Sequence, residues 1–372
     1  MILEKIKIRI NNLFAIITFV CLKQFFRKKK STSNRVLFIN TGLLGDVIIS
    51  SLILKNEAKL NNVSSTIYIL FDKRFAGLFK EYNGNINLLF LNSNKYRLNL
   101  FYRISFLREL RKLDLEKSIN ISFCRRTFDD EITLLSGSHN SIGFVNAPKI
   151  PKLFSDHIDS NYSEIIKPPT GNHYLDIVYL LERLGIKSPY HETLMLNLKN
   201  IPSDFHKNLK TNKKVISLAP QTSRSIKDWN YENFVELVGQ IIEKFNAIVI
   251  LLGDKKNDTY IIKSNSNIID LKGATTLEEA ASIIAISDLF IGNDSGLFHL
   301  AKTNGIPRIG LIGGGAVNVV FPYGNTENEI LLYKEMNCFG CHWKCIYEKA
   351  HCLQEVTVEN VINSVRLLLK DE

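Results

Sequence analysis

The segment Gly42-Leu43-Leu44-Gly45-Asp46 could do chemistry, because two glycines lead into a carboxylate. Glycines let the backbone come close to a ligand, and the start of the helix that follows attracts anions. The spacing excludes the three-glycine dinucleotide fingerprint and the Walker loop, which needs Lys followed by Ser or Thr. Asp46 is therefore interpreted as a candidate base at a helix start, and the alternative is an aspartate that only caps the helix.

A second candidate is the polar loop from Ala219 to Trp229, which carries Arg224 and Lys227. Two cations on one loop could neutralise a diphosphate, since guanidinium and ammonium groups are the side chains that proteins use to bind phosphates. The alternative is a solvated basic loop that binds no ligand.

A third candidate is the turn Gly292-Asn293-Asp294-Ser295-Gly296, which leads into a helix. The first N–H groups of a helix have no partner within it, so this turn offers a pyrophosphate site, to which Ser295 adds a hydroxyl. His299 follows Ser295 by one helical turn, on the same face. A lone histidine on a helix is more often structural, but the glycine-flanked turn favours a functional role here.

These residues follow short apolar runs, the pattern of buried strands in a parallel sheet. Such runs alternate with helical stretches twice along the chain, and 372 residues are too many for one ordinary core. The sequence therefore predicts an α/β fold with two doubly wound, Rossmann-like domains facing a central cleft, the GT-B architecture, in which ligands bind at the carboxyl ends of strands. Strands are predicted at 36–39, 65–71, 86–91, 117–123, 215–220, 247–253, 268–271, 289–292 and 308–313, and helices at 47–60, 231–245 and 277–286.

Together the three segments resemble glycosyltransferase family 9, the lipopolysaccharide heptosyltransferases. The family's Leu-Gly-Asp turn corresponds to residues 44–46, and its loop with Lys and Trp before a Phe-x-x-Leu helix corresponds to Lys227, Trp229 and residues 234–237. Its Asp-Thr/Ser-Gly-x-x-His-x-Ala turn corresponds to residues 294–301, followed by Gly305-x-Pro307. The resemblance covers residues 35 to about 365.

The resemblance implies an inverting glycosyltransferase that needs no catalytic metal. It implies that Asp46 takes the proton from the acceptor hydroxyl and that Lys227 neutralises the departing diphosphate. A contact to the donor's adenosine is implied after the strand that ends at Gly253, with Asp254 and Asp258 as candidates. The implied donor-binding residues are Thr41, Gly42, Gly45, Thr222, Arg224, Asp294, Ser295, Gly296 and His299.

The domain boundaries are predicted from composition together with this resemblance. Residues 1–34 form a basic amphipathic segment, and residues 35–200 an N-terminal acceptor-binding domain. A polar, lysine-rich linker at 201–213 leads to a C-terminal domain at 214–372 for the nucleotide-sugar donor, with a cysteine-rich segment at 338–352.

Six cysteines are present, and four of them fall within fifteen residues. The four are Cys338, Cys341, Cys345 and Cys352. Four thiols this close could form a structural zinc or iron site, although the spacing is tighter than the usual two separated pairs. The alternative is a set of reduced cysteines in a packed loop. Cys21 and Cys124 lie far apart, which is not the pattern of a disulfide framework.

The positive charge gathers at the N-terminus. Residues 1–30 carry eight basic side chains and one acidic, which is +7 of the formal net charge of +10, so the charge pattern does not support nucleic-acid binding by the whole protein. The apolar run at 13–22 has ten residues, whereas spanning a bilayer needs about twenty, and basic residues flank it. It is predicted to lie on an anionic membrane surface, and the alternative is a helix docked on the folded domain.

The sequence therefore predicts a peripheral membrane enzyme of cell-envelope biosynthesis, on the inner face of the bacterial inner membrane. It would transfer heptose from ADP-heptose to a lipid-linked lipopolysaccharide core. Two alternatives stay open: a transferase of the same fold that uses another nucleotide sugar for O-antigen or glycoprotein assembly, and a non-catalytic nucleotide-sugar-binding scaffold. A nicotinamide dehydrogenase is disfavoured, because no Gly-x-Gly-x-x-Gly follows any predicted strand.

Overall fold

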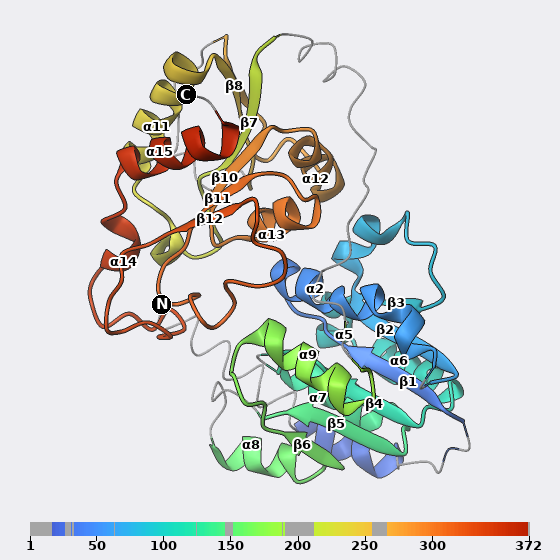
Figure 1. The fold of residues 1–372 in the computed structure, drawn as a ribbon. Helices are drawn as coiled ribbons and strands as arrows, with labels where there is room; N and C mark the ends of the chain where they lie inside the picture. The colour runs from blue at the N-terminus through green and yellow to red at the C-terminus, as the bar shows by residue number, and fades with distance from the viewer. Residues whose placement is uncertain are drawn as a thin grey trace. The chain divides into compact units, whose positions relative to one another are not determined.

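The computed structural model describes residues 17–26, 31, 33–62, 64–123, 125–145, 152–187, 189, 212–254 and 266–370. The chain divides into two compact units (Figure 1). Unit 1 comprises Met1–Ala76 and Tyr82–Tyr190, and unit 2 comprises Gly77–Glu81 and His191–Glu372. The linker predicted at 201–213 lies outside the described residues apart from 212 and 213.

Unit 1 is built on a six-stranded parallel sheet in the order β3-β2-β1-β4-β5-β6. The central strand β1 is apolar after its first residue, Arg35, as a strand with both faces covered requires, and Leu37 and Ile39 are fully buried. Val36 pairs with Ile67 of β2 on one side and with Lys117 of β4 on the other. The strands are β1 (Arg35–Ile39), β2 (Thr66–Asp72), β3 (Asn87–Leu91), β4 (Lys117–Asn120), β5 (Asn140–Phe144) and β6 (Glu164–Ile166).

The helix predicted at 47–60 is divided into three short helices. Ser51 and Asn56 stand at the two breaks, and their side chains donate hydrogen bonds back to the carbonyls of Ile48 at 2.6 Å and Leu52 at 2.9 Å. Such bonds compete with a continuous helix. The helices from here to residue 183 are α2 (Leu44–Ser50), α3 (Leu52–Lys55), α4 (Glu57–Leu60), η1 (Lys73–Phe79, 3-10), α5 (Ser93–Leu98), α6 (Leu100–Lys112), α7 (Thr127–Leu135), α8 (Lys152–Asp159) and α9 (His173–Arg183).

Unit 2 is built on a second six-stranded parallel sheet, in the order β12-β11-β10-β7-β8-β9. Ile291 of its central strand pairs with Leu218 on one side and with Ile309 on the other. The strands are β7 (Lys214–Ala219), β8 (Ala247–Leu251), β9 (Ile268–Asp270), β10 (Leu289–Asn293), β11 (Arg308–Leu311) and β12 (Glu329–Leu332).

The helix predicted at 231–245 is found at those residues. It buries Phe234, Leu237 and Ile241 on one face and ends at Asn246, whose φ of 45° is the left-handed conformation of a helix C-terminus. The helices of this part of the chain are η2 (Ser225–Lys227, 3-10), α11 (Tyr231–Phe245), α12 (Leu277–Ala285), α13 (Gly296–Thr303), α14 (His351–Gln354) and α15 (Val358–Leu369).

The two sheets share one strand order. In each, the first strand of the unit lies between the second and the fourth in sequence. At that place the connections leave in opposite directions, which opens a crevice at the carboxyl ends of the two neighbours, where open α/β sheets bind ligands. The three segments predicted to do chemistry follow β1, β7 and β10, so each lies at such a point. The predicted α/β class with two doubly wound sheets is confirmed.

Residues 17–25 form a helix that is docked on unit 1. Phe19, Leu22 and Phe26 are buried in one cluster with side chains of α6, α7 and α8, and Arg103 donates a hydrogen bond to Thr18 Oγ1 at 2.9 Å. The described part of the predicted membrane segment is thus a helix docked on the folded domain, which was the alternative to a membrane contact. Residues 1–16 and 27–30 lie outside the described residues. Of the helices that the structure describes, none is both long and apolar enough to cross a bilayer.

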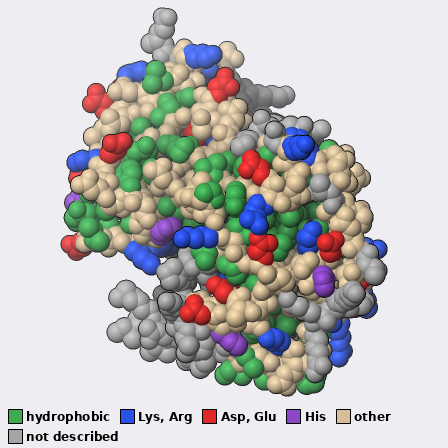
Figure 2. All heavy atoms as spheres, turned by 60° about the horizontal axis from the view of Figure 1, so that its bottom comes forward, with side chains coloured by type: hydrophobic (Ala, Val, Ile, Leu, Met, Phe, Trp, Pro, Cys, Tyr) green, Lys and Arg blue, Asp and Glu red, His purple; other side chains and the backbone are tan. Residues whose placement is uncertain are grey.

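On the face drawn in Figure 2, the basic side chains of the described residues do not gather in one area. Basic and acidic side chains lie beside one another there, with hydrophobic side chains between them.

Candidate active site

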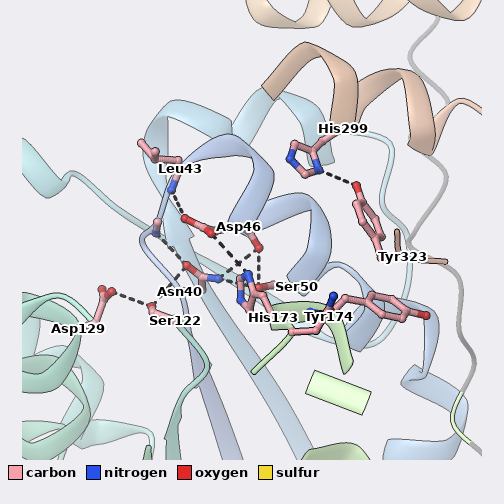
Figure 3. A network of polar contacts seen from close by, with 12 residues as sticks. Asn40, Leu43, Asp46, Ser50, Ser122, Asp129, His173, Tyr174, His299 and Tyr323 are labelled. Carbon is pink, nitrogen blue, oxygen red and sulfur yellow. Dashed lines mark hydrogen bonds and ion pairs between the residues drawn. The ribbon is translucent and has the colours of Figure 1, made fainter. Parts of the chain in front are cut away.

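Asp46 is the third residue of α2, after Gly45, and its two carboxylate oxygens have different partners (Figure 3). Oδ2 accepts a hydrogen bond from the Leu43 N–H at 2.9 Å, which is the contact of a helix cap. Oδ1 lies 3.6 Å from Nδ1 of His173. The side chain is 37% exposed, so Asp46 both caps the helix and presents a carboxylate to solvent.

Asn40 and Gly42 fix the turn before Asp46. Asn40 Oδ1 accepts a hydrogen bond from the Gly42 N–H at 2.9 Å, and its Nδ2 donates to Ser50 Oγ at 2.7 Å. A Cβ atom at position 42 would lie 2.5 Å from Asp46 Oδ2 and 2.7 Å from Asn40 Oδ1. Glycine is therefore required there for space, directly beside the carboxylate.

Thr41 belongs to a buried network at the carboxyl ends of β1 and β4. Its Oγ1 donates to Asp129 Oδ1 at 2.5 Å, and Ser122 Oγ donates to Asp129 Oδ2 at 2.8 Å. Arg126 Nη1 donates to the Thr41 carbonyl at 2.8 Å. Burial raises the pKa of Asp129, and the contacts with Thr41, Arg126 and Ser122 oppose that rise. The Thr41 hydroxyl, a predicted donor contact, is thus engaged within the turn itself.

His173 is the first residue of α9 and comes after the cap residue Asn172, whose Oδ1 accepts hydrogen bonds from two N–H groups of the first turn. Its ring is buried, with its centroid 5.3 Å from that of Phe123. Burial lowers the pKa of His173, against the opposing effects of Asp46 and the Ile121 backbone. A neutral imidazole therefore faces the Asp46 carboxylate at neutral pH.

In unit 2, Lys227 ends η2, and its Nζ lies 2.6 Å from Oδ2 of Asp294. The Lys227 side chain is 20% exposed and that of Asp294 8%. The Trp343 ring lies against the ammonium, with its centroid 5.2 Å from Nζ. The structure thus brings together two predicted residues from separate loops and adds an aromatic ring that the sequence did not predict.

Asn293 ties the ends of β7 and β10 together. Its Nδ2 donates to the Pro220 carbonyl at 2.8 Å, and its Oδ1 accepts from the Trp229 N–H at 3.1 Å. Trp229 is almost fully buried, which anchors the loop in the core of unit 2. The loop that carries Lys227 is thereby fixed against the turn that carries Asp294.

Thr222 and Arg224 lie in the same loop. Thr222 Oγ1 donates to the Arg224 carbonyl at 2.8 Å and accepts from the Arg224 N–H at 3.1 Å, so the hydroxyl shapes the loop. The Thr222 N–H donates to Asp228 Oδ1 at 2.7 Å. Arg224 is exposed, and its Nη2 donates to the Trp343 carbonyl at 3.3 Å. A guanidinium has five N–H donors, so Arg224 can hold this contact and bind an anion as well.

Helix α13 begins at Gly296, with Ser295 at the position before it. The Ser295 side chain makes no capping hydrogen bond, and its Oγ is buried with no partner in the described part of the chain. The first amide N–H groups of a helix are unpaired and carry partial positive charge. Next to Asp294, the turn therefore offers an anion both a hydroxyl and helix amides.

His299 lies in an aromatic stack one turn further along α13. Its Nδ1 is 2.6 Å from the Tyr323 hydroxyl. Its ring stacks on Phe321 and on Tyr323, with centroids 5.1 and 5.6 Å away. His299 is therefore held by a polar contact with Tyr323 and by ring contacts with Phe321 and Tyr323.

The four clustered cysteines lie in the irregular segment after β12 and at the start of α14. Cys352 is buried, and the Gly314 N–H donates to its Sγ at 3.2 Å. Burial raises the pKa of Cys352, the hydrogen bond from Gly314 lowers it, and the nearby Cys338, Cys341 and Cys345 raise it. Within the described residues, no group of three or more His, Cys, Asp or Glu side chains is placed to hold a metal ion.

Sequence reasoning missed His173, Tyr323 and Trp343. The apolar helical run after Asn172 signals a helix but not the partner of its first residue. The run Gly313-Gly314-Gly315 does signal a close approach by another group, which the structure identifies as Trp343 and Phe339. Of the two candidate adenosine contacts, Asp254 is exposed after β8 and Asp258 lies outside the described residues.

A model of glycosyltransferase family 9 (heptosyltransferase) matches residues 153–351. Lipooligosaccharide heptosyltransferase 2 of Campylobacter jejuni serotype O:6 is 25% identical over 335 residues, which cover 87% of this chain and 96% of that protein. The protein of the same name from serotype O:2 is 29% identical over 171 residues, which cover 44% of this chain and 53% of that protein. The match thus spans about half the length of the second relative.

Three solved glycosyltransferase structures share the fold. The glycosyl transferase family 9 protein of Veillonella parvula has a TM-score of 0.70 at 17% identity, over 93% of this chain and 100% of that one. E. coli ADP-heptose lps heptosyltransferase II has a TM-score of 0.65 at 16% identity, over 90% and 98%. The iron-containing dodecameric glycosyltransferase TibC of enterotoxigenic E. coli has a TM-score of 0.56 at 14% identity, over 92% and 78%. The predicted GT-B class is confirmed.

Proposed function

The chain belongs to glycosyltransferase family 9, the heptosyltransferase family, and from that premise we propose that it transfers heptose from ADP-heptose to a lipopolysaccharide core. The two C. jejuni relatives are named for heptose transfer to lipooligosaccharide, which supports the sugar and the class of acceptor. E. coli heptosyltransferase II, which shares the fold, is named for ADP-heptose, and this supports the donor.

The observation that carries the proposal is the Lys227–Asp294 pair at the carboxyl ends of β7 and β10. A departing nucleoside diphosphate needs positive charge and aligned dipoles when no metal ion supplies them. Lys227 supplies an ammonium that Asp294 holds in place, and Arg224 on the same loop supplies a second cation. Ser295 Oγ and the first amides of α13 complete the set of donors for the diphosphate.

Asp46 is the base in this proposal. As the acceptor oxygen bonds to the anomeric carbon, its proton passes to Asp46 Oδ1, and the bond from that carbon to the diphosphate oxygen breaks with its electrons leaving on ADP. A single displacement of this kind inverts the anomeric centre and needs one base. The partly exposed carboxylate of Asp46, oriented through its Oδ2 by the Leu43 N–H, supports this role.

We also propose one structural zinc or iron ion in the segment 338–352, apart from the chemical step. Thiolates suit both metals, and the segment supplies four cysteines within fifteen residues. TibC, which shares the fold, is named as iron-containing. Binding would need the four sulfur atoms to move closer together, given the arrangement described above. Metal analysis of the purified protein should give one equivalent, and a value well below one would contradict this proposal.

We propose further that the enzyme works peripherally at the inner face of the inner membrane, where a lipid-linked acceptor is held. The +7 charge of residues 1–30 supports attraction to anionic lipids. Ile17, Val20 and Phe25 of the docked helix are 53%, 44% and 81% exposed, so apolar groups remain available there. Sedimentation with anionic vesicles should remove the protein from solution and neutral vesicles should not; equal recovery with both would contradict an electrostatic contact.

The donor assignment is tested by binding. Calorimetry with ADP-heptose and a panel of other nucleotide sugars would compare the wild type with Lys227→Met and with the control Lys244→Met, whose side chain is exposed on α11. We expect Lys227→Met to weaken ADP-heptose binding by about tenfold or more, since a hydrogen bond to a charged group contributes roughly 1.5–3 kcal/mol. Preference for another nucleotide sugar would favour the same-fold alternative, and absence of any binding would contradict the proposal.

A further inference from the structure

Trp343 belongs to the cysteine-rich segment and is seated on three consecutive glycines. A Cβ atom at Gly313 would lie 2.4 Å from the indole Cη2, and one at Gly315 would lie 2.6 Å from the Trp343 backbone nitrogen. The ring is 8% exposed, so it is buried although the segment around it has no helix or strand. The glycine run after β11 therefore forms a seat with space for this indole.

The backbone at this place is strained. His342 and Trp343 both have positive φ, at 50° and 60°, the left-handed conformation that non-glycine residues seldom adopt. Two such residues in succession cost free energy that the surrounding contacts must offset. Strain of this kind is found where a side chain must be held at a particular place, and here it turns the indole onto the glycine seat.

Trp343 contacts both cations of the donor loop, one through its ring and one through its backbone. Its ring centroid lies 5.2 Å from Lys227 Nζ, within the range of a cation–π contact. The backbone carbonyl of Trp343 accepts a hydrogen bond from Arg224 Nη2 at 3.3 Å. Lys227 is thus held by Asp294 and by the indole, and among the described residues no other aromatic ring makes a cation–π contact with this ammonium.

The rest of the segment ties the indole to the cysteines. The Gly340 N–H donates to the Gly314 carbonyl at 2.8 Å, and the Gly314 N–H donates to Cys352 Sγ at 3.2 Å. A Cβ atom at Gly314 would lie 2.2 Å from the Phe339 ring, so the segment contacts the glycine run on both sides of Trp343. The same glycines that seat the indole therefore contact a member of the cysteine cluster.

We propose that Trp343 is a positioning residue for the donor diphosphate. Its indole face holds the Lys227 ammonium, its carbonyl holds Arg224, and the glycine seat with the cysteine-rich segment keeps both contacts in place. The inference rests on the proposed function, which assigns the two cations to the diphosphate. It extends that function by making the cysteine-rich segment a part of the donor site.

The test is a double-mutant cycle read by calorimetric binding of ADP. Trp343→Leu should weaken ADP binding about five- to tenfold, the size expected for a partly desolvated cation–π contact, and Trp343→Phe should recover part of the loss. In a Lys227→Met background, Trp343→Leu should have a much smaller effect, because the contact it removes is already gone. Ile346→Ala, at a 76% exposed position of the same segment, should leave ADP binding unchanged.

The outcomes separate the inference from the function on which it rests. If Trp343→Leu binds ADP like the wild type, or loses the same factor with and without Lys227, the positioning role is wrong while nucleotide binding stands. If the wild type binds no nucleoside diphosphate, both are overturned. A thermal melt of each variant identifies a general loss of folding. If Trp343→Leu does not fold, the Trp343→Phe variant, which keeps an aromatic ring against the glycines, is used instead: its coupling to Lys227→Met supports the positioning role, and equal losses with and without Lys227 contradict it.

Discussion

Asp46 and Asp294 are both partly enclosed carboxylates at strand ends, and their partners suit them to different tasks. Asp294 lies 2.6 Å from the Lys227 ammonium, so its negative charge pairs with a cation. Asp46 faces the imidazole of His173, whose pKa burial lowers, so the neighbour of Asp46 is neutral at neutral pH. The first arrangement fits a residue that orients Lys227, and the second fits one that takes up a proton.

The pairing of Asp46 with His173 gives a prediction for kinetics. His173→Leu should lower kcat by about ten- to a hundredfold, because the carboxylate loses the polar neighbour beside Oδ1 and misplacement of a catalytic group by about 1 Å can cost that much. His173→Gln, which keeps a polar group there, should lose less. The KM for the donor should change much less than kcat, since the contacts proposed above for the donor diphosphate lie in unit 2. Equal losses in the two variants, or a raised donor KM, would speak against a positioning role.

Gly42 gives a prediction about space. In Gly42→Ala the added Cβ would lie 2.5 Å from Asp46 Oδ2, so the turn must shift; we expect a lower melting temperature, in line with about 1–3 kcal/mol for overpacking, and a lower kcat. Gly239→Ala is the matched control, because nothing lies within 4 Å of its added Cβ in the helix α11. That change should stabilise the protein by roughly 0.5–1 kcal/mol. Thermal melts and turnover on both variants check this, and a harmless Gly42→Ala would refute it.

At the scale of the element, the spacing of apolar residues and the capping residues at helix ends predict the long, regular helices and strands. The helix Tyr231–Phe245 has a clear apolar face and an Asn230 cap, and it was predicted at its observed bounds. The strands β5, β6 and β12 were not predicted. β6 has three residues and begins with Glu164, and β5 begins with Asn140 and Ser141. Neither strand therefore has the continuous apolar run that predicts a buried strand. Their pairing with neighbours, which no local pattern encodes, makes them strands.

Helix α9 gives a prediction about pH. Burial raises the pKa of Asp176, in its first turn, from 3.8 to about 6, against hydrogen bonds from Thr170 and the Gly171 backbone. Between about pH 4 and 6 the folded protein therefore keeps a proton that the unfolded chain has lost, so this group's contribution to stability falls as pH rises through that window. Asp176→Asn removes this titrating carboxyl group and with it the fall in stability. The melting temperature of Asp176→Asn minus that of the wild type should increase from pH 4.5 to pH 7.5. A difference that stays constant over that range would contradict the raised pKa of Asp176.

At the scale of the whole molecule, the part of the site that could be predicted is the part that one stretch of sequence encodes. Asp46, Lys227 and Asp294 each follow a strand and a turn with recognisable residues, so a single segment points to each of them. His173 and Trp343 could not be found in this way. Each meets its partner only because separate elements fold together, and no spacing in the chain records that contact.

The repeated strand order explains why the candidate residues fall where they do. Both sheets place their first strand between the second and the fourth, so the described strands of each unit have a topological switch point, where open α/β sheets bind ligands. In unit 1 the turn after β1 presents Asp46, and in unit 2 the turns after β7 and β10 present Lys227 and Asp294. One topology, used twice, thus supplies the proposed base and the proposed diphosphate site.

The most direct test of the account is heptose transfer by the purified protein, with ADP-heptose and truncated lipopolysaccharide core, for the wild type and for Asp46→Asn. Glu109→Gln, an exposed carboxylate of unit 1 paired with Lys112, is the control. The account predicts transfer with an inverted anomeric centre by the wild type and the control, and a loss of at least about a hundredfold in Asp46→Asn, the size of a general-base contribution. Transfer by Asp46→Asn at the wild-type rate would contradict the assignment of the base, and a wild type that uses no nucleotide sugar would contradict the function.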